Sequence, residues 1–541
     1  EALETETSLP NFRQGDAIIL YERNRDTDNV TNKMVFKGNI EYLTENEISI
    51  RLRATQQNPS VLPAESLYAI EHDTMDTTFR SMYQGLYIYL SARKERRDLL
   101  LSQRPPRFDE SLDSMISRSE DDFTRIALKA KAAQDYFLLI GPPGTGKTSC
   151  ALKKMVETFH ADKDAQILLL SYTNRAVDEI CKSLASIAPA VDFIRVGSEL
   201  SCDEAYRGHL IENELSSCNR RSEVYERIRN CRIIVGTVAA ISGKPELFRL
   251  KHFDVAIIDE ATQILEPQLL GILCARGEDG KDAIDKFVLI GDHKQLPAVV
   301  QQNTEQSAIY DESLLSIGLT NLKDSLFERL YRNCTATVHR SYDMLCRQGR
   351  MHPEVALFAN RAFYGGRLIP VGLPHQIESS DTICRLAFYP SVPEKAGASA
   401  KINYSEARIV ADLAARIYED HQTDFDESRT LGIITPYRSQ IALIKKEIES
   451  LGIPALNRIL VDTVERFQGS ERDVIIYSFC VNYPYQLKFL SNLTEEEGVL
   501  IDRKLNVALT RARKQMFITG VPELLERNPL YKSLLKLIES F

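Results

Sequence analysis

The sequence predicts an α/β protein in which two parallel sheets, each covered by helices, follow a small β-barrel on a helical stalk. Three observations predict this. Strand-like runs fill residues 15–70, a helical period begins near residue 79, and short apolar runs alternate with helical stretches from about residue 135 onward. A chain of 541 residues is long enough for three or four domains with large cores.

The N-terminal part has the alternation of half-buried strands. In the stretch EISIRLRA (47–54), Ile48, Ile50 and Leu52 alternate with polar and charged residues. The further short strands GDAIILYE and KMVFKGNIEYL are separated by glycine and polar turns. We therefore expect a small barrel within residues 1–75.

A helical stalk is expected over residues 76–110. Apolar residues recur there at helical spacing, namely Phe79, Met82, Tyr83, Leu86, Tyr87 and Leu90. The stalk also carries four basic residues, Arg93, Lys94, Arg96 and Arg97. We interpret these as a solvated helix end, with a nucleic-acid contact as the alternative.

Two sets of short apolar runs mark the two parallel sheets. The first set is FLLI (137–140), ILLL (167–170), RIIV (232–235), VAII (255–258) and FVLI (287–290). The second set is LGII (431–434), ILVDTV (459–464), VIIYSF (474–479) and QMFITG (515–520). We expect the first α/β domain over residues 111–335, with a short helical insertion at about 198–230, and the second over residues 336–541.

A short polar segment follows every run of the first set. These segments are the glycine-rich loop after 140, SYTNRAVDEI after 170, GTVAAIS after 235, DEATQ after 258 and GDHKQLP after 290. In open α/β sheets ligands bind at the carboxyl ends of the strands. The five segments therefore mark one edge of the first sheet as a binding face.

The glycine-rich loop, GPPGTGKTS (141–149), lies between an apolar run and a predicted helix. It fits the pattern G-x-x-x-x-G-K-[ST], in which backbone N–H groups and a helix N-terminus surround a phosphate. Lys147 would reach the β- and γ-phosphates, and the Thr148 hydroxyl would bind Mg²⁺. A chance match is the alternative, but the strand-then-helix setting favours nucleotide binding by Gly141, Pro142, Pro143, Gly144, Thr145, Gly146, Lys147, Thr148 and Ser149.

Two carboxylates, Asp259 and Glu260, follow the buried run VAII. Asp259 suits a Mg²⁺ site beside Thr148, and Glu260 could orient and deprotonate an attacking water. The alternative is a helix N-cap, since Asp is a favoured cap and Glu suits a first helical turn. The upstream phosphate loop favours the catalytic interpretation.

Three further polar side chains suggest a cleft between the two sheets. Gln295, in GDHKQLP, could touch both a γ-phosphate and the neighbouring domain, with a surface loop as the alternative. The second sheet has no G-K-[ST] sequence but carries Arg350 and Arg511. An arginine supplied from across a cleft stabilises the charge that develops during phosphoryl transfer, although arginines are also common on surfaces.

Composition narrows the class of protein. The net charge is −9 and the pI about 5.7, whereas a protein that coats nucleic acid non-specifically is usually basic. A polymer partner would therefore be held in a local channel. The ten cysteines form no CxxC pair, which favours reduced thiols in an intracellular protein, and no apolar run approaches a membrane span. Because the chain begins at Glu1, we expect a longer protein.

Eleven segments in a fixed order resemble the superfamily 1 helicases, in the branch that includes the nonsense-mediated-decay helicase, the immunoglobulin-mu-binding helicase and the replication nuclease-helicase. They are GPPGTGKTS, SYTNRAVDEI, VGTVAA, IIDEATQ, GDHKQLPAVV, SLFERL, GRMHPEVALFAN, FYGGRL, ITPYRSQ, VDTVERFQGSERDVII and RKLNVALTRAR. AIEHDTMD and MYQGLY resemble the nuclease-helicases in particular, in which a nuclease domain precedes the barrel. The resemblance implies two tandem RecA-like domains, with barrel and stalk as an accessory domain.

The resemblance also implies roles at matching positions. Catalytic roles are implied for Lys147, Thr148, Asp259, Glu260, Gln295, Arg350 and Arg511, with the two arginines as arginine fingers and with Gly469 and Glu471 close to the nucleotide. A single strand would contact Thr173, Asn174, Thr237, Thr435, Arg438 and Thr463. Hydroxyls and amides hold phosphates without a basic surface, which accounts for the acidic pI.

The implied activity is that of an ATP- and Mg²⁺-dependent helicase or translocase that moves 5′ to 3′ on single-stranded nucleic acid. DNA is favoured over RNA, and the implied setting is DNA replication or repair by a monomer without membrane attachment. The protein would act in the cytoplasm and nucleoid of a bacterium or in the nucleus of a eukaryote. Two alternatives stay open: an RNA helicase or ribonucleoprotein-remodelling ATPase, and an ATP-controlled clamp that unwinds nothing.

Two departures from the family concern the base of the nucleotide. Gly349 stands where the family often has a tyrosine that stacks on adenine, and Asp122–Phe123 stands where it often has a base-reading glutamine. Neither position concerns the phosphates. Our hypothesis is normal hydrolysis with a weakened preference for ATP over other nucleoside triphosphates.

Overall fold

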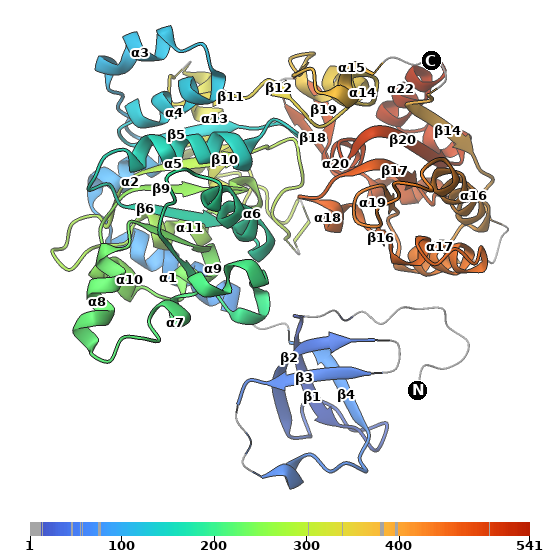
Figure 1. Cartoon of the computed structure of the whole chain (residues 1–541), viewed down its shortest axis with the longest axis horizontal. Helices are drawn as coiled ribbons and strands as arrows, with labels where there is room; N and C mark the ends of the chain where they lie inside the picture. The colour runs from blue at the N-terminus through green and yellow to red at the C-terminus, as the bar shows by residue number, and fades with distance from the viewer. Residues whose placement is uncertain are drawn as a thin grey trace.

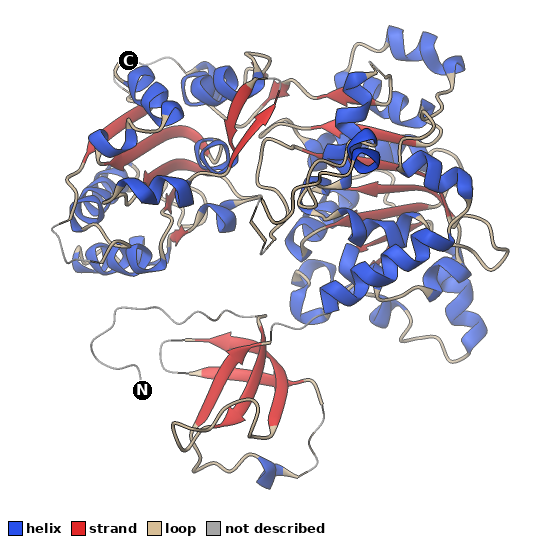
Figure 2. Ribbon diagram, turned by 180° about the vertical axis from the view of Figure 1, so that it is seen from behind, coloured by secondary structure: helices blue, strands red, loops and turns tan. Residues whose placement is uncertain are grey.

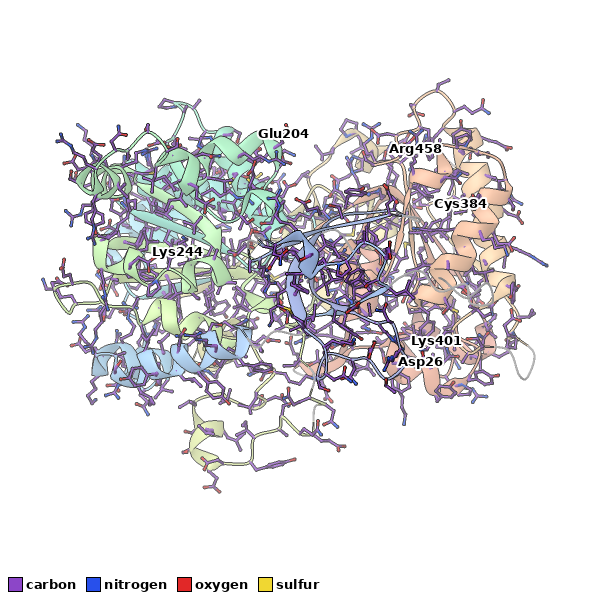
Figure 3. All side chains as sticks on the ribbon, turned by 90° about the horizontal axis from the view of Figure 1, so that it is seen from below. Asp26, Glu204, Lys244, Cys384, Lys401 and Arg458 are labelled. Carbon is purple, nitrogen blue, oxygen red and sulfur yellow. The ribbon has the colours of Figure 1, made fainter. Side chains whose placement is uncertain are left out.

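The computed structural model describes residues 12–540 apart from 13–14, 45–46, 55, 57, 74–76, 301, 304, 338, 379–382, 395–398 and 497. Figure 1 shows two α/β lobes side by side, with a small N-terminal sheet below them. Figure 3, seen from below, shows that the N-terminal part, which carries Asp26, lies across the boundary between the lobes. Within the described residues, no helix is long and apolar enough to cross a membrane.

The N-terminal sheet has four antiparallel strands in the order β3-β2-β1-β4. They are β1 (Ala17–Glu22), β2 (Val35–Leu43), β3 (Ile48–Leu52) and β4 (Tyr68–His72). Alternate residues such as Ile18, Tyr21, Phe36 and Ile40 are buried on one face, as a period of two requires. No ladder between described residues joins β3 to β4, so closure into a barrel stays a prediction. The end of AIEHDTMD, at 74–76, lies outside the described residues.

The stalk consists of α1 (Thr77–Ser91) and α2 (Lys94–Leu100). The apolar stripe that predicted α1 faces outward, with Tyr83 73% and Tyr87 75% exposed. The opposite face is buried because Gly85 lies directly against the backbone of α11 (Glu266–Leu273): a Cβ at Gly85 would stand 2.3 Å from the Pro267 carbonyl oxygen.

The basic end of the stalk is not a solvated helix end throughout. Arg96 is buried, and both Arg96 and Arg93 contact the Asp282 carboxylate of the first lobe. The Arg96 guanidinium also donates to the main-chain oxygens of Ile284 (2.5 Å) and Asp285 (3.0 Å). Arg93 and Arg96 thus anchor the stalk on the first lobe, and a nucleic-acid contact at this end of the stalk stays an alternative.

The first lobe contains a seven-stranded parallel sheet in the order β11-β5-β10-β9-β6-β8-β7. Its strands are β5 (Tyr136–Ile140), β6 (Ile167–Ser171), β7 (Phe193–Val196), β8 (Ile233–Thr237), β9 (Phe253–Ile258), β10 (Ile284–Gly291) and β11 (Tyr342–Met344). All five predicted runs are strands. The sequence analysis missed β7 and β11, and because β11 pairs with β5, the predicted boundary at 335/336 is too early: the first sheet extends to Met344.

Helices cover both faces of this sheet (Figure 2). Phe137 and Leu139 of β5 enter one apolar core and Leu138 and Ile140 the other, which explains why the strand reads as a continuous apolar run. The helices are α3 (Asp113–Arg118), α4 (Asp122–Ala132), α5 (Lys153–His160), α6 (Asn174–Ala185), α7 (Ile211–Glu214), α8 (Arg221–Asn230), α9 (Val238–Ser242), α10 (Glu246–Leu250), α11, α12 (Glu312–Ser316) and α13 (Leu326–Ala336).

The second lobe contains a five-stranded parallel sheet in the order β14-β20-β17-β15-β16. Its strands are β14 (Leu386–Pro390), β15 (Leu431–Ile434), β16 (Leu460–Asp462), β17 (Arg472–Ser478) and β20 (Ala512–Gly520), beside the pairs β12 (Arg347–Gln348) with β13 (Ile369–Pro370) and β18 (Leu493–Glu496) with β19 (Val499–Asp502). The helices are α14 (Pro353–Tyr364), α15 (Pro374–Ile377), α16 (Tyr404–Asp420), α17 (Arg438–Ser450), α18 (Val464–Phe467), α19 (Leu487–Leu490), α20 (Arg503–Leu509), α21 (Pro522–Leu525) and α22 (Pro529–Ile538). The chain is therefore an α/β protein with two parallel sheets in tandem, as predicted.

Candidate functional site

A cavity of about 810 Å³ lies between the two lobes. The first lobe lines it with segments that follow β5, β6, β9 and β10, and the second lobe with segments around residues 350, 470 and 511. Most of the predicted nucleotide-binding residues line this one cavity: Pro143, Gly144, Thr145, Gly146, Lys147, Thr148, Ser149, Asp259, Glu260, Gln295, Arg350, Gly469, Glu471 and Arg511. Gly141 and Pro142 lie behind it, where their carbonyl oxygens accept hydrogen bonds from the Lys147 ammonium group.

The phosphate loop turns between β5 and a helix that begins at Lys147. Gly144 and Gly146 have left-handed φ angles of +74° and +75°, which glycine adopts without strain. A Cβ at Gly141 would stand 2.0 Å from the Lys147 Cγ, so this position must also be glycine for the lysine to lie along the loop. Burial lowers the pKa of Lys147, and the nearby carboxylates of Asp292 and Asp259 oppose that shift.

Asp259 and Glu260 lie directly after β9, beside the loop. The Thr148 hydroxyl donates to Asp259 Oδ2, and Asp259 Oδ1 accepts from the Glu260 N–H at 2.8 Å. Burial raises the pKa of Asp259, and burial followed by the Asp259 charge raises the pKa of Glu260 to about 7. Neither carboxylate caps the short helix that follows, so the helix-cap alternative is not supported.

Gln295 and Arg511 meet across the lobe boundary. Gln295 is buried rather than in a surface loop, and its Oε1 accepts from Arg511 Nη2 at 3.3 Å. Arg511 is only 2% exposed and also donates to the main-chain oxygens of Val507 (3.1 Å) and Ser470 (3.3 Å). Burial first, and the charge of Arg350 second, lower the pKa of Arg511 to about 9. Two guanidinium groups held this close favour an anion between them.

Arg350 reaches the cavity because the segment before it lies against the phosphate loop. The Gly349 N–H donates to the Gly144 carbonyl oxygen at 2.8 Å, and a Cβ at Gly144 would stand 2.4 Å from the Arg350 Cβ. Arg350 Nε donates to Glu471 Oε2 at 2.5 Å. A glycine in the loop of one lobe therefore makes room for the arginine of the other.

The cavity also contains two of the positions that depart from the family pattern. Phe123, Gly349, Arg347 and Val371 line it, and Phe123 Cζ lies 3.5 Å from where a Cβ at Gly146 would stand. Asp122 does not line the cavity. An aromatic ring and an aliphatic side chain can contact any nucleobase by its flat face.

The predicted strand contacts occupy the carboxyl ends of strands in both sheets. Thr173 and Thr237 cap α6 and α9, and each hydroxyl oxygen accepts a backbone N–H at 3.1 Å while keeping its own proton to donate. Asn174 and Arg438 begin α6 and α17, and Thr463 precedes α18.

Thr435 is placed differently from the prediction. Its side chain is fully buried and its hydroxyl, which has no hydrogen-bond partner among the described residues, lines a separate cavity of about 30 Å³. A hydroxyl contact with a nucleic-acid strand at Thr435 is therefore not available in this structure.

The sequence analysis missed three buried polar residues beside the cavity: Asp292, Tyr364 and Asn506. Asp292 follows β10 in the quoted segment GDHKQLP, so an acid directly after a strand was a signal that could have been used. Tyr364 and Asn506 carry no local signal, since they contact Asp292 and Lys294 of the first lobe only when the two lobes meet.

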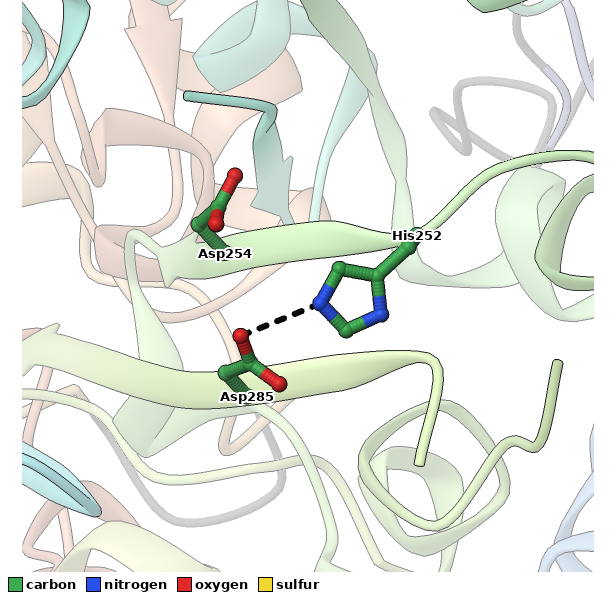
Figure 4. A group of neighbouring side chains, drawn as sticks. All are labelled: His252, Asp254 and Asp285. Atoms are coloured by element: carbon green, nitrogen blue, oxygen red, sulfur yellow. Dashed lines mark ion pairs between the residues drawn. The ribbon is translucent and has the colours of Figure 1, made fainter. Parts of the chain in front are cut away.

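A second cluster, His252, Asp254 and Asp285, lies where β9 and β10 begin, at the edge of the sheet opposite the phosphate loop (Figure 4). His252 Nε2 lies 3.0 Å from Asp285 Oδ2, and Asp254 Oδ2 accepts from the Gln166 N–H at 2.7 Å. His252 and Asp285 are half or more exposed. These contacts satisfy the group as an ordinary surface ion pair far from the phosphate loop.

Comparison with known proteins gives matches over most of the chain. Two family models, each described as an AAA domain, match residues 118–224 with 211–303 and residues 322–523. The chain is 27% identical to the DNA replication ATP-dependent helicase/nuclease DNA2 of Bos taurus, over 98% of this chain and 50% of the relative. It is 28% identical to the DNA replication ATP-dependent helicase/nuclease JHS1 of Arabidopsis thaliana, over 98% of this chain and 38% of the relative.

The chain thus spans half or less of the length of these two curated relatives. Among solved structures, the complex of the Arterivirus nonstructural protein 10 (helicase) with DNA matches 75% of this chain and 65% of its own, with a TM-score of 0.37 and 15% identity.

Proposed function

The chain belongs to the superfamily 1 helicases, and from that premise we propose that it is an ATP-driven motor that moves 5′ to 3′ along single-stranded DNA and separates duplexes. One observation carries the proposal. The phosphate loop of one lobe and Arg350 and Arg511 of the other line the same cavity. A triphosphate there would hold the lobes together, and its hydrolysis would release them.

Each of the site residues would have a separate role in hydrolysis. Lys147 and the loop N–H groups would hold the β- and γ-phosphates, while Arg350 and Arg511 would stabilise the charge on the transferring group. Glu260, with its raised pKa, would accept the proton of the attacking water, and Gln295 would contact the γ-phosphate.

The donor set around Thr148 fits Mg²⁺. The hydroxyl of Thr148 and the carboxylate of Asp259 are hydrogen-bonded to each other and offer the oxygen ligands that Mg²⁺ prefers. Bound there, the ion would neutralise phosphate charge. We propose Thr148 and Asp259 as the residues that hold it.

A single strand would lie across the carboxyl ends of both sheets. Thr173, Asn174 and Thr237 of the first lobe and Arg438 and Thr463 of the second would contact its phosphates. Hydroxyl and amide donors of this kind bind phosphate without sequence preference. Opening and closing of the cavity would then move one set of contacts relative to the other.

The decisive experiment compares unwinding of duplexes that carry a 5′ or a 3′ single-stranded tail, in DNA and in RNA, with ATP turnover followed in parallel. We expect unwinding of 5′-tailed DNA and turnover stimulated by single strands, and none of either with Lys147→Ala. Unwinding of RNA alone would favour the ribonucleoprotein-remodelling alternative. Tight strand binding with slow turnover and no unwinding would identify an ATP-controlled clamp, and turnover indifferent to strands would refute the motor.

The remaining features complete the proposal. The N-terminal sheet would act as an accessory barrel that contacts nucleic acid near the lobe boundary, below which it lies. The protein would work as a monomer in DNA replication or repair, in the nucleus or the nucleoid. A nuclease domain in the same protein, ahead of Glu1, stays a prediction.

A further inference from the structure

A buried hydrogen-bond network crosses the lobe boundary behind the cavity. Its centre is Tyr364, which is 1% exposed at the end of α14 in the second lobe. The Tyr364 hydroxyl donates to Asp292 Oδ2 of the first lobe at 2.7 Å and accepts from Asn506 Nδ2 at 2.8 Å. Burial raises the pKa of Tyr364 well above its usual value, so the hydroxyl stays a neutral donor.

The same carboxylate oxygen fixes the carboxamide of Gln295, which lines the cavity. Asp292 Oδ2 also accepts from Gln295 Nε2 at 2.8 Å, while Gln295 Oε1 accepts from Arg511. Both ends of the Gln295 carboxamide are therefore occupied, and its orientation is set. A change at the Tyr364 hydroxyl acts on Gln295 through one shared atom.

The network forms only when the lobes are in contact. Asp292 and Gln295 follow β10, whereas Tyr364 and Asn506 belong to α14 and α20. Lys294 joins the lobes at the same place: its carbonyl oxygen accepts from Asn506 Nδ2 at 2.7 Å and its ammonium group donates to the Phe363 carbonyl oxygen at 2.7 Å. Separation of the lobes would break the bonds that cross the boundary, which join Tyr364 to Asp292, Asn506 and Phe363 to Lys294, and Arg511 to Gln295.

We propose that Tyr364 is a positioning residue which, through Asp292, holds Gln295 in its catalytic orientation when the lobes close. The phenol touches neither the cavity nor the nucleotide and acts only through the carboxylate. It thereby makes hydrolysis conditional on lobe contact. This inference rests on the proposed ATPase activity.

The test removes a single oxygen atom. Tyr364→Phe keeps the ring and removes only the hydroxyl, and with it the bonds to Asp292 and Asn506. Tyr531→Phe is the matched control, since Tyr531 is also 1% exposed and donates to a carboxylate, Asp502 Oδ2 at 2.9 Å, but within the second lobe and away from the cavity. We expect Tyr364→Phe to lower kcat about tenfold with the KM for ATP unchanged, since Gln295 is held less firmly in its catalytic orientation once one hydrogen bond to the Asp292 carboxylate is lost. Tyr531→Phe should keep the wild-type kcat, while its Tm falls by as much as that of Tyr364→Phe.

A double-mutant cycle with Gln295→Ala separates positioning from general destabilisation. If Tyr364 acts through Gln295, then Tyr364→Phe has no further effect on kcat in the Gln295→Ala background. Multiplication of the two single effects would overturn the proposal, as would a wild-type kcat in Tyr364→Phe. A wild-type chain that hydrolyses no ATP would instead overturn the proposed function, and this inference with it.

Discussion

Replacement of Arg511 by alanine tests whether the second lobe completes the ATPase site. Arg511 is almost fully buried, and its guanidinium group reaches Gln295 across the lobe boundary while two main-chain oxygens hold it from behind. None of these hydrogen bonds of Arg511 involves the phosphate loop. The variant therefore keeps the groups that would bind the ground state of ATP.

The expected effect follows from what the guanidinium would do. Neutralisation of the transferring phosphoryl group by an arginine from across a cleft accelerates hydrolysis on the order of a thousandfold, or about 4 kcal/mol of transition-state stabilisation. We therefore expect kcat to fall by that factor in Arg511→Ala, with ATP affinity within about threefold of wild type because uniform binding is not lost.

The assay measures single-strand-stimulated phosphate release beside binding of a fluorescent ATP analogue and thermal unfolding. Arg385→Ala is the control for loss of a buried arginine: Arg385 lies in the same lobe, is equally enclosed, and pairs with Glu378 rather than lining the cavity. Normal turnover by Arg511→Ala would refute the role of Arg511. An equal loss in Arg385→Ala would show that the effect is one of folding.

Three further predictions address the loop, the base and a buried acid. Gly144→Ala should lower kcat more than tenfold because a Cβ there would stand 2.4 Å from the Arg350 Cβ. The control Gly366→Ala, with the same φ of +74° and nothing within 4 Å of the added Cβ, should cost only about 1 kcal/mol of backbone strain. Equal activity of the two variants would contradict the close contact between the lobes. The kcat/KM values for ATP and GTP should lie within about a hundredfold of each other, since Phe123 and Gly349 line the cavity where the family often has a base-reading glutamine and a stacking tyrosine. A larger preference for ATP, above roughly 2.7 kcal/mol, would reject this. Burial raises the pKa of Glu406 from 4.5 to about 7, so the folded chain keeps a proton that the unfolded chain releases, and stability is lost as pH rises through 7. Urea titrations between about pH 5 and 8 should show the free energy of unfolding falling by up to about 3 kcal/mol relative to Glu406→Gln. Parallel pH curves for the two proteins would contradict the raised pKa.

The local parts of the site could be predicted from the sequence because each is written in consecutive residues. The phosphate loop needs glycine where φ is positive, and the apolar runs must be continuous where both faces of a sheet are buried. The strands β7 and β11 were not predicted because Arg195 and Asp343 interrupt their short apolar runs. Arg195 is tolerated there because it pairs with Asp178.

The contacts between distant segments could not be predicted in the same way. Nothing near Tyr364 in the sequence indicates that its hydroxyl would meet Asp292, because that contact depends on how two separately folded lobes meet. Thr435 shows the reverse case: its position in a matching segment predicted a strand contact, but the side chain turns into the second lobe. Segment matching locates a residue along the chain and leaves its side-chain direction open.

The contact between the stalk and α11 attaches the stalk to the first lobe. At Gly85 and Gly271 two backbones touch, with a Cβ at Gly271 only 3.1 Å from the Gly85 Cα, and backbone cannot yield as a flexible side chain can. Helix α11 begins six residues after Glu260, so the stalk is packed directly on the lobe that carries the phosphate loop. In the proposed motor, anything anchored to the stalk would move with that lobe, and the other lobe would move relative to both.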